Sequence, residues 1–203
     1  ETERDRALAG WFDPHVRREV EALLAAANGE SHPHVRLLLR LCLSAVLIKV
    51  SRRASETSSE KVTKHIGRGS ASRLFLARVF ELTDGLRQLG EPSEFPVARI
   101  EQGDARKLSL LVVPQSIDAI VTSPPYAGTY DYTDHLALRT AFLRLDAWRA
   151  REIGSRASFR RDPRLAAFRW RKDFESVLAQ MAAVLKPKGR VVLLMGDSLA
   201  GGR

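Results

Sequence analysis

The sequence predicts an α/β protein in which a helical segment, residues 1–93, precedes a part with alternating strands and helices, residues 94–203. Residues 11–90 carry apolar side chains at helical spacing. From residue 96 onward, short apolar runs alternate with helical stretches, and such alternation is typical of a parallel sheet. We therefore expect a helical N-terminal segment followed by a sheet of parallel strands.

Three helices are expected in the first segment, over about 14–29, 34–50 and 75–90. Pro14 suits the first turn of a helix, because its missing N–H is not needed there. Gly90 ends the third helix shortly before another proline. The second helix is strongly apolar and is predicted to be buried.

Three apolar runs in the second part are predicted strands: residues 97–100, 117–121 and 191–195. The run at 119–121 is short, apolar and free of polar alternation. Such runs are typical of strands buried on both faces, with helices on either side of the sheet.

Two helices are expected between the last two strands. The first runs from about Thr133 to Leu145, and the second carries an apolar stripe from Phe174 to Leu185. Pro187 is predicted to stop the second helix and Gly189 to turn the chain into the last strand.

Composition narrows the class of protein. A net charge of +9 and a pI of about 10.3 favour a polyanionic partner. One cysteine, Cys42, excludes an internal disulfide and fits a reducing, cytoplasmic compartment. No apolar run has the length of a membrane span, and the five histidines show no metal-binding spacing, so we predict no bound metal.

The most informative residues are Ser123, Pro124, Pro125 and Tyr126, which directly follow the predicted strand 117–121. Ligands of parallel sheets bind beyond the carboxyl ends of the strands. The two prolines lack N–H groups and restrict the backbone, so the turn presents mainly carbonyl acceptors beside an aromatic ring. This combination suits a flat ligand that carries an amino group. The alternative is a proline turn that only ends a strand.

Ser-Pro-Pro-Tyr resembles the catalytic motif of the amino-directed DNA methyltransferases. The resemblance implies part of a Rossmann-like sheet, S-adenosylmethionine as methyl donor, and transfer to N4 of cytosine or N6 of adenine. The serine form is commoner among the cytosine enzymes. The resemblance also implies that Ser123 and the Pro124 carbonyl accept hydrogen bonds from the amino group, while Tyr126 stacks on a flipped base.

A second segment, Gly103-Asp104-Ala105, resembles the one that precedes the catalytic strand in this family. The resemblance implies that Asp104 and Ala105 bind the adenine end of the cofactor, the carboxylate accepting from the amino group. Residues 174–195 resemble the family's fifth-strand unit, whose role is architectural.

No strand followed by a Gly-x-Gly loop is recognisable, and Gly67-Arg68-Gly69 lacks a preceding strand. The chain begins without methionine and stops just after a predicted strand. We therefore expect a fragment of a longer protein, with the cofactor loop encoded elsewhere and poor cofactor binding by the chain alone.

Residues 144–173 hold ten Arg or Lys against four acidic residues, with aromatic residues interspersed. Such a segment suits phosphate and base contacts, and Arg160 and Arg161 are the candidates for DNA binding. Tyr130, just beyond the tetrad, is a candidate wall of the base pocket. In each case packing of the aromatic residues in the core is the alternative. A weaker second basic patch comprises Lys49, Arg52, Arg53, Lys61, Lys64, Arg68 and Arg73.

The leading hypothesis is thus a DNA amino-methyltransferase with DNA as partner, and a restriction enzyme is a possible companion. An RNA-base or protein-glutamine methyltransferase is a nearby alternative. The absent glycine loop leaves open a non-catalytic, nucleic-acid-binding half of a modification complex.

Overall fold

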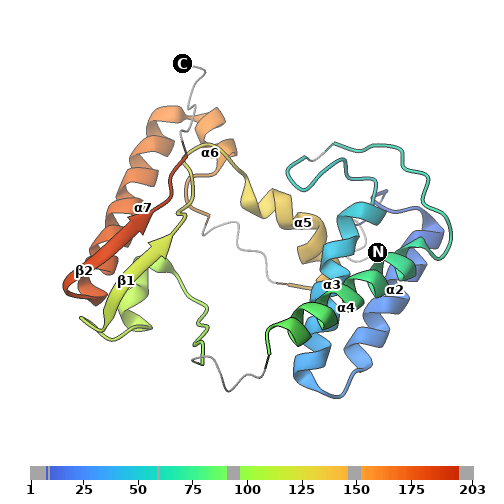
Figure 1. The fold of residues 1–203 in the computed structure, drawn as a ribbon. Helices are drawn as coiled ribbons and strands as arrows, with labels where there is room; N and C mark the ends of the chain where they lie inside the picture. The colour runs from blue at the N-terminus through green and yellow to red at the C-terminus, as the bar shows by residue number, and fades with distance from the viewer. Residues whose placement is uncertain (1–7, 9, 59, 91–96, 146–151, 197–203) are drawn as a thin grey trace. The chain divides into compact units, whose positions relative to one another are not determined.

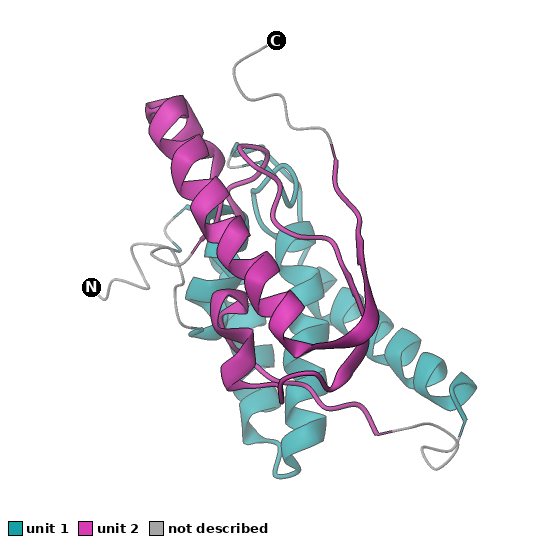
Figure 2. Ribbon diagram, turned by 90° about the vertical axis from the view of Figure 1, so that its left-hand side faces the viewer, with its two compact units in different colours: residues 1–96, 133–148 teal, residues 97–132, 149–203 magenta. Residues whose placement is uncertain are grey.

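The computed structural model describes residues 8, 10–58, 60–90, 97–145 and 152–196. Clustering of contacts divides the chain into two compact units (Figure 2). The helical unit comprises residues 1–96 and 133–148, and the α/β unit comprises residues 97–132 and 149–203.

Four helices form the helical unit in the described residues: α2 (Pro14–Gly29), α3 (Pro33–Val50), α4 (Ser70–Gln88) and α5 (Tyr132–Leu143) (Figure 1). The three helices predicted before residue 93 are confirmed. Proline occupies the first turn of both α2 and α3, where a backbone N–H has no partner to lose.

The core of the helical unit is built from the apolar stripes of its helices. In α2 the stripe has helical spacing, and in α3 it includes Cys42, whose thiol is buried as predicted. Helix α5 contributes Phe142, which is fully buried with its ring centroid 5.9 Å from that of Phe12. The α2 residues in the core are Val16, Val20, Leu24 and Ala27.

Arg53 is the buried cation of this unit, only 3% exposed. Its Nε donates to the carbonyl of Ser58 at 2.6 Å, while its terminal nitrogens donate to the carbonyls of His135 and Asp134 at 2.9 and 3.0 Å. A planar guanidinium can serve several carbonyls at once. Arg53 therefore fastens both its own loop and the first turn of α5.

The α/β unit contains a two-stranded parallel sheet of β1 (Ile117–Thr122) and β2 (Leu185–Leu193). The 3-10 helix η2 (Ala105–Leu110), the short helix α6 (Arg156–Arg161) and the long helix α7 (Pro163–Val184) complete its described part. Helix α7 runs beside the sheet and packs against η2 and α6 (Figure 1). The predicted strand 117–121 and the helix after Thr133 are confirmed.

Three sequence predictions about this part are wrong. Residues 97–100 form no strand, and Val97 is 98% exposed, because no described segment pairs with them. β1 is not buried on both faces: Val121 is 78% exposed, and β2 is the one described strand that pairs with it. Helix α7 ends at Val184, before Pro187, because the chain enters β2 directly at Leu185.

The predicted fold class is met only in part. The described residues form an α/β structure that is mostly helical, with two parallel strands and no evident Rossmann sheet. Residues 133–148 were expected in the second part, but they cluster with the helical unit, where Leu138 and Phe142 are buried. None of the described helices is long and apolar enough to cross a membrane.

Replacing Arg53 with alanine is expected to lower the free energy of unfolding by about 3 kcal/mol, because three partly buried carbonyls lose their charged donor. Urea unfolding of the whole chain measures the change. Arg52→Ala is the matched control. Arg52 is an exposed neighbour paired with Asp13, and its loss should cost less than about 1 kcal/mol. Equal losses in the two variants would contradict the anchoring role of Arg53.

Candidate active site at the end of strand β1

The Ser-Pro-Pro-Tyr loop, residues 123–126, begins where β1 ends. Thr122 pairs with Leu193 in the parallel register, and the Leu194 N–H donates to the Thr122 carbonyl at 3.0 Å. The loop therefore starts at the carboxyl end of the sheet, beside the end of β2. Ligands of parallel sheets bind at this edge.

A chain of hydroxyl groups closes the loop. Ser123 Oγ lies 2.8 Å from Tyr126 Oη, and Tyr126 Oη donates to the carbonyl of Leu194 at 3.3 Å. Either hydroxyl could donate across the 2.8 Å contact, but a carbonyl can only accept and a phenol has a single hydrogen. The arrangement that satisfies both contacts therefore has Tyr126 donating to the Leu194 carbonyl and Ser123 donating to Tyr126. The hydrogen of the exposed Ser123 hydroxyl is then engaged with Tyr126, and the Ser123 oxygen keeps its lone pairs as acceptors.

The two prolines are held from α7. Trp170 Nε1 donates to the Pro125 carbonyl at 3.4 Å, and the Trp170 ring stacks on Phe174 with centroids 5.1 Å apart. Pro124 is buried, and no described residue donates to its carbonyl oxygen. Among the described residues, neither Ser123 Oγ nor the Pro124 carbonyl thus needs to accept from a protein donor.

Sequence reasoning missed the role of Trp170, which it treated as one of the aromatics of the basic segment. Two signals were available. A largely buried indole N–H requires an acceptor, and Phe174 stands four residues further along, on the same face of the helix.

Three tyrosines follow one another along the loop. The rings of Tyr126 and Tyr130 have centroids 6.5 Å apart, and those of Tyr130 and Tyr132 are 5.5 Å apart. Burial, reinforced by the neighbouring tyrosines, raises the pKa of Tyr132. The Tyr130 ring therefore lies between the rings of Tyr126 and Tyr132 along the loop.

The loop turns at Gly128, which has φ +67°, a conformation that favours glycine. A Cβ there would lie 3.1 Å from the buried ring of Phe159 in α6. Asp131 accepts from the Ala157 N–H at 2.8 Å and pairs with Arg156. Asp131 thus anchors α6 to the loop.

Asp104 accepts hydrogen bonds from three N–H groups of Arg106. Its Oδ1 accepts from the backbone N–H and from Nε of Arg106, and its Oδ2 accepts from Nε and Nη2. A carboxylate has about four acceptor positions. Hydrogen bonds from Arg106 hold the pKa of Asp104 below its usual value. A ligand amino group would have to share this carboxylate with Arg106.

Arg106 also donates to Asp173 of α7 at 2.9 Å, and the two carboxylates together raise its pKa. The cluster therefore ties the start of η2 to α7. Ala105 is exposed as the first residue of η2. No hydrogen bond or ion pair between described residues joins Asp104 or Ala105 to the Ser-Pro-Pro-Tyr loop.

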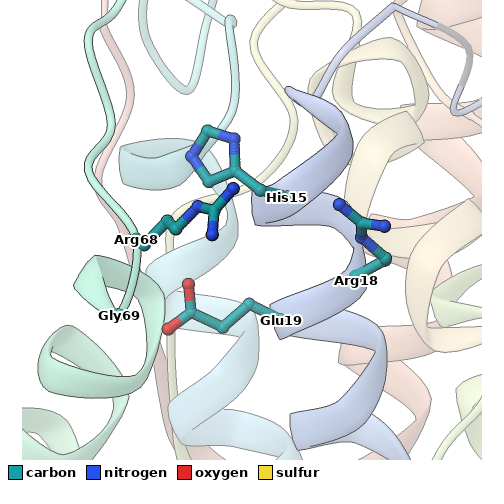
Figure 3. A pocket seen from close by; sticks show the side chains of 5 residues that line it. All are labelled: His15, Arg18, Glu19, Arg68 and Gly69. Carbon is teal, nitrogen blue, oxygen red and sulfur yellow. The ribbon is translucent and has the colours of Figure 1, made fainter.

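Gly67-Arg68-Gly69 precedes α4 and follows no strand, as expected. A shallow polar pocket beside it is lined by His15, Arg18, Glu19, Arg68 and Gly69 (Figure 3). Glu19 accepts from the Ser72 N–H at 2.8 Å and from the Ser72 hydroxyl at 2.6 Å. Burial opposes ionisation of Glu19, but these bonds outweigh it and lower its pKa. A carboxylate thus already occupies the start of α4.

The basic residues fall into two groups. Arg160 and Arg161 are exposed in α6 and form no ion pair with a described residue. Three residues of the second basic patch contact groups within the chain. Arg53 is buried, Lys64 donates to the Ile48 carbonyl at 3.0 Å, and Lys61 Nζ lies 4.8 Å from the centre of the Trp11 ring. Its cations hold the loop after α3 in place.

The described residues contain no cluster of three or more side chains able to hold a metal ion. Comparisons with family models, with curated proteins and with solved structures found no match to this chain.

Replacing Asp104 with asparagine is expected to lower stability by about 1 kcal/mol at neutral pH, because charge-assisted bonds to Arg106 are lost. A carboxylate whose pKa falls on folding stabilises the protein above its unfolded pKa of about 3.9. The difference between wild type and variant should therefore shrink as pH falls below that value. Urea unfolding at a series of pH values measures it.

The matched control is Asp118→Asn, since the Asp118 side chain is 82% exposed and pairs with Lys186. Its effect at neutral pH should be small. A pH-independent loss for Asp104→Asn would show that its charge does not matter.

Proposed function

We propose that this chain carries the base-binding, catalytic loop of a DNA amino-methyltransferase, with N4 of cytosine as the preferred target. The observation that carries the proposal is the hydroxyl chain of Ser123, Tyr126 and the Leu194 carbonyl, which leaves Ser123 Oγ as an acceptor. An acceptor at this place is what an exocyclic amino group requires.

The chemistry follows from the electronic structure of the amino group. Its lone pair is delocalised into the base, which makes the nitrogen a poor nucleophile. Ser123 Oγ and the Pro124 carbonyl would each accept one amino hydrogen and localise the lone pair on the nitrogen, as preorganised dipoles. The Tyr126 ring, tethered through its hydroxyl, would offer a face to the flipped base.

The methyl donor is the less supported half of the proposal. The resemblance implies S-adenosylmethionine, which supplies an electrophilic methyl group. Yet Asp104 is already paired with Arg106, and Glu19 occupies the start of α4 behind Gly69. The described residues therefore do not fit the expected adenine contact as they stand, and the roles of Asp104 and Ala105 stay predictions.

The pairing of Asp104 with Arg106 and the position of Glu19 favour a second candidate function. A chain with an amino-recognising loop but no ready cofactor contact suits a non-catalytic, nucleic-acid-binding half of a modification complex. Adenine N6 or an RNA base remains an alternative target of the enzyme, because two acceptors recognise any exocyclic amino group.

The target is tested by expressing the longest reading frame that contains this chain and analysing nucleosides of the host DNA by mass spectrometry. N4-methylcytosine is expected, and Ser123→Ala should lower its level by at least tenfold, because one acceptor is lost. Finding N6-methyladenine would change the target base. Finding neither methylated base would favour the non-catalytic, nucleic-acid-binding alternative.

The role of Tyr126 is tested by Tyr126→Phe, which keeps the ring and removes the hydroxyl. The freed Ser123 hydrogen would then compete with the amino group, so kcat should fall about tenfold with KM nearly unchanged. Tyr126→Ala should raise KM as well, because stacking is lost. Wild-type kcat in Tyr126→Phe would refute the hydroxyl chain's role.

Arg160→Ala combined with Arg161→Ala is expected to weaken DNA binding at every sequence, because phosphate contacts are lost. The slope of log affinity against log salt should fall by about 2 over roughly 50 to 200 mM salt. Arg18→Ala with Arg36→Ala, two arginines of the helical unit that lie outside both basic patches, is the matched control. An unchanged slope in the α6 variant would remove these residues from the interface.

A further inference from the structure

Phe168 stands out on α7 because it is 66% exposed. The helix buries the opposite side, at positions with helical spacing. Phe168 lies two residues from both Ala166 and Trp170, about 200° around the helix from each. The buried positions of α7 are Ala166, Val177, Met181 and Val184.

Cations surround this ring. Arg164, Arg171 and Lys172 stand four residues before, three after and four after Phe168, so all three share its face of the helix. Each is exposed and forms no ion pair with a described residue. The only acid between residues 160 and 172 is Asp162, which accepts from the Leu165 N–H at 3.0 Å and caps α7.

Phe80 of α4 provides a comparison inside the same chain. It is also 66% exposed. Its neighbours one turn away, Leu76 and Asp84, are apolar and acidic, and the nearby Arg78 is paired with Glu81. An exposed phenylalanine ringed by unpaired cations is thus a property of α7 and not of exposed phenylalanines in general.

We propose that this face of α7 binds single-stranded nucleic acid, with one unpaired base stacked on Phe168 and the flanking phosphates on Arg164, Arg171 and Lys172. Base–aromatic stacking with cations along the backbone is how sequence-tolerant single-strand sites work. Duplex bases are already stacked on each other and leave the ring nothing to cover. Arg164 and Lys172 are about 12 Å apart along the helix, enough for a few nucleotides.

The inference rests on the proposed function in one respect, that DNA is the partner, and it adds a site for a strand outside the duplex. It assigns no step to Phe168 in methyl transfer. Ser123 and the Pro124 carbonyl would recognise one amino group, whereas Phe168 would hold an unpaired base of any kind.

The test is fluorescence anisotropy of the full chain with a labelled, unstructured single-stranded oligodeoxynucleotide and with a duplex of the same length. Phe168→Ala should weaken single-strand binding by about tenfold or more and duplex binding by much less. Phe168→Tyr should restore it, and Phe168→Leu should not, because leucine keeps apolar area without a ring face. Phe80→Ala, the control of equal exposure, should bind as wild type.

Unchanged single-strand binding in Phe168→Ala overturns the inference, and so does an equal loss in Phe80→Ala. Binding to phosphatidylserine vesicles in preference to the oligonucleotide, lost in Phe168→Ala, would instead assign the face to a lipid surface. Ring-dependent single-strand binding without any methylated base would sustain this inference and remove the proposed methyl transfer. A methylated base together with normal single-strand binding by Phe168→Ala would sustain the proposed methyl transfer and overturn this inference.

Discussion

Parallel pairing of β1 with β2 is the constraint on which the rest of the α/β unit depends. The register sets Thr122 against Leu193, so the first residues beyond the strands, Ser123 and Leu194, come together. Tyr126 can then bridge them with one hydroxyl. A slip of one residue would turn Leu194 to the other face and open the hydroxyl chain.

The register itself depends on a tight passage at the start of β2. Ile117 pairs with Leu185 and Ala119 with Arg190, so residues 186–189 are accommodated in an irregular stretch. A Cβ on Gly189 would lie 3.0 and 3.2 Å from the backbone carbonyls of Lys186 and Asp118. Those carbonyls cannot yield as a side chain can, which makes glycine the residue for this passage.

Helix α7 has one side that packs within the α/β unit and one side that is exposed. From its buried side, Trp170 reaches the Pro125 carbonyl and Asp173 reaches Arg106, so one rigid element holds both the proline loop and η2. Its outward side carries Phe168 and unpaired cations. Ligand-facing groups placed on a packed helix keep their geometry better than groups on a free loop.

Local signals predicted the parts of this fold that depend on neighbouring residues. The ends of α2 follow from Pro14 and Gly29, and the position of the tetrad follows from the apolar run before it. Features that depend on distant partners were missed. Whether residues 97–100 form a strand depends on pairing with another strand, and the local sequence does not show whether a partner strand lies beside them.

The candidate site shows the same division. The sequence identified Ser123 and Tyr126 as chemical groups, but the direction of their hydrogens depends on the Leu194 carbonyl, 68 residues beyond Tyr126. Asp104 was assigned to a ligand although Arg106 stood two residues away. Which lone pairs a side chain leaves free is a matter of conformation that residue types alone do not determine.

The hydroxyl chain gives a physical reason for serine and tyrosine to occur together in this loop. A carboxylate is an acceptor in any orientation, whereas a serine hydroxyl is equally able to donate. Facing an amino group, a donating serine would repel the hydrogens that it must accept. Here Tyr126 Oη accepts a hydrogen bond from the Ser123 hydroxyl and donates its own hydrogen to the Leu194 carbonyl, just beyond β2. In the proposed reaction, tyrosine thus makes serine serve as a carboxylate would, without placing a negative charge beside the base.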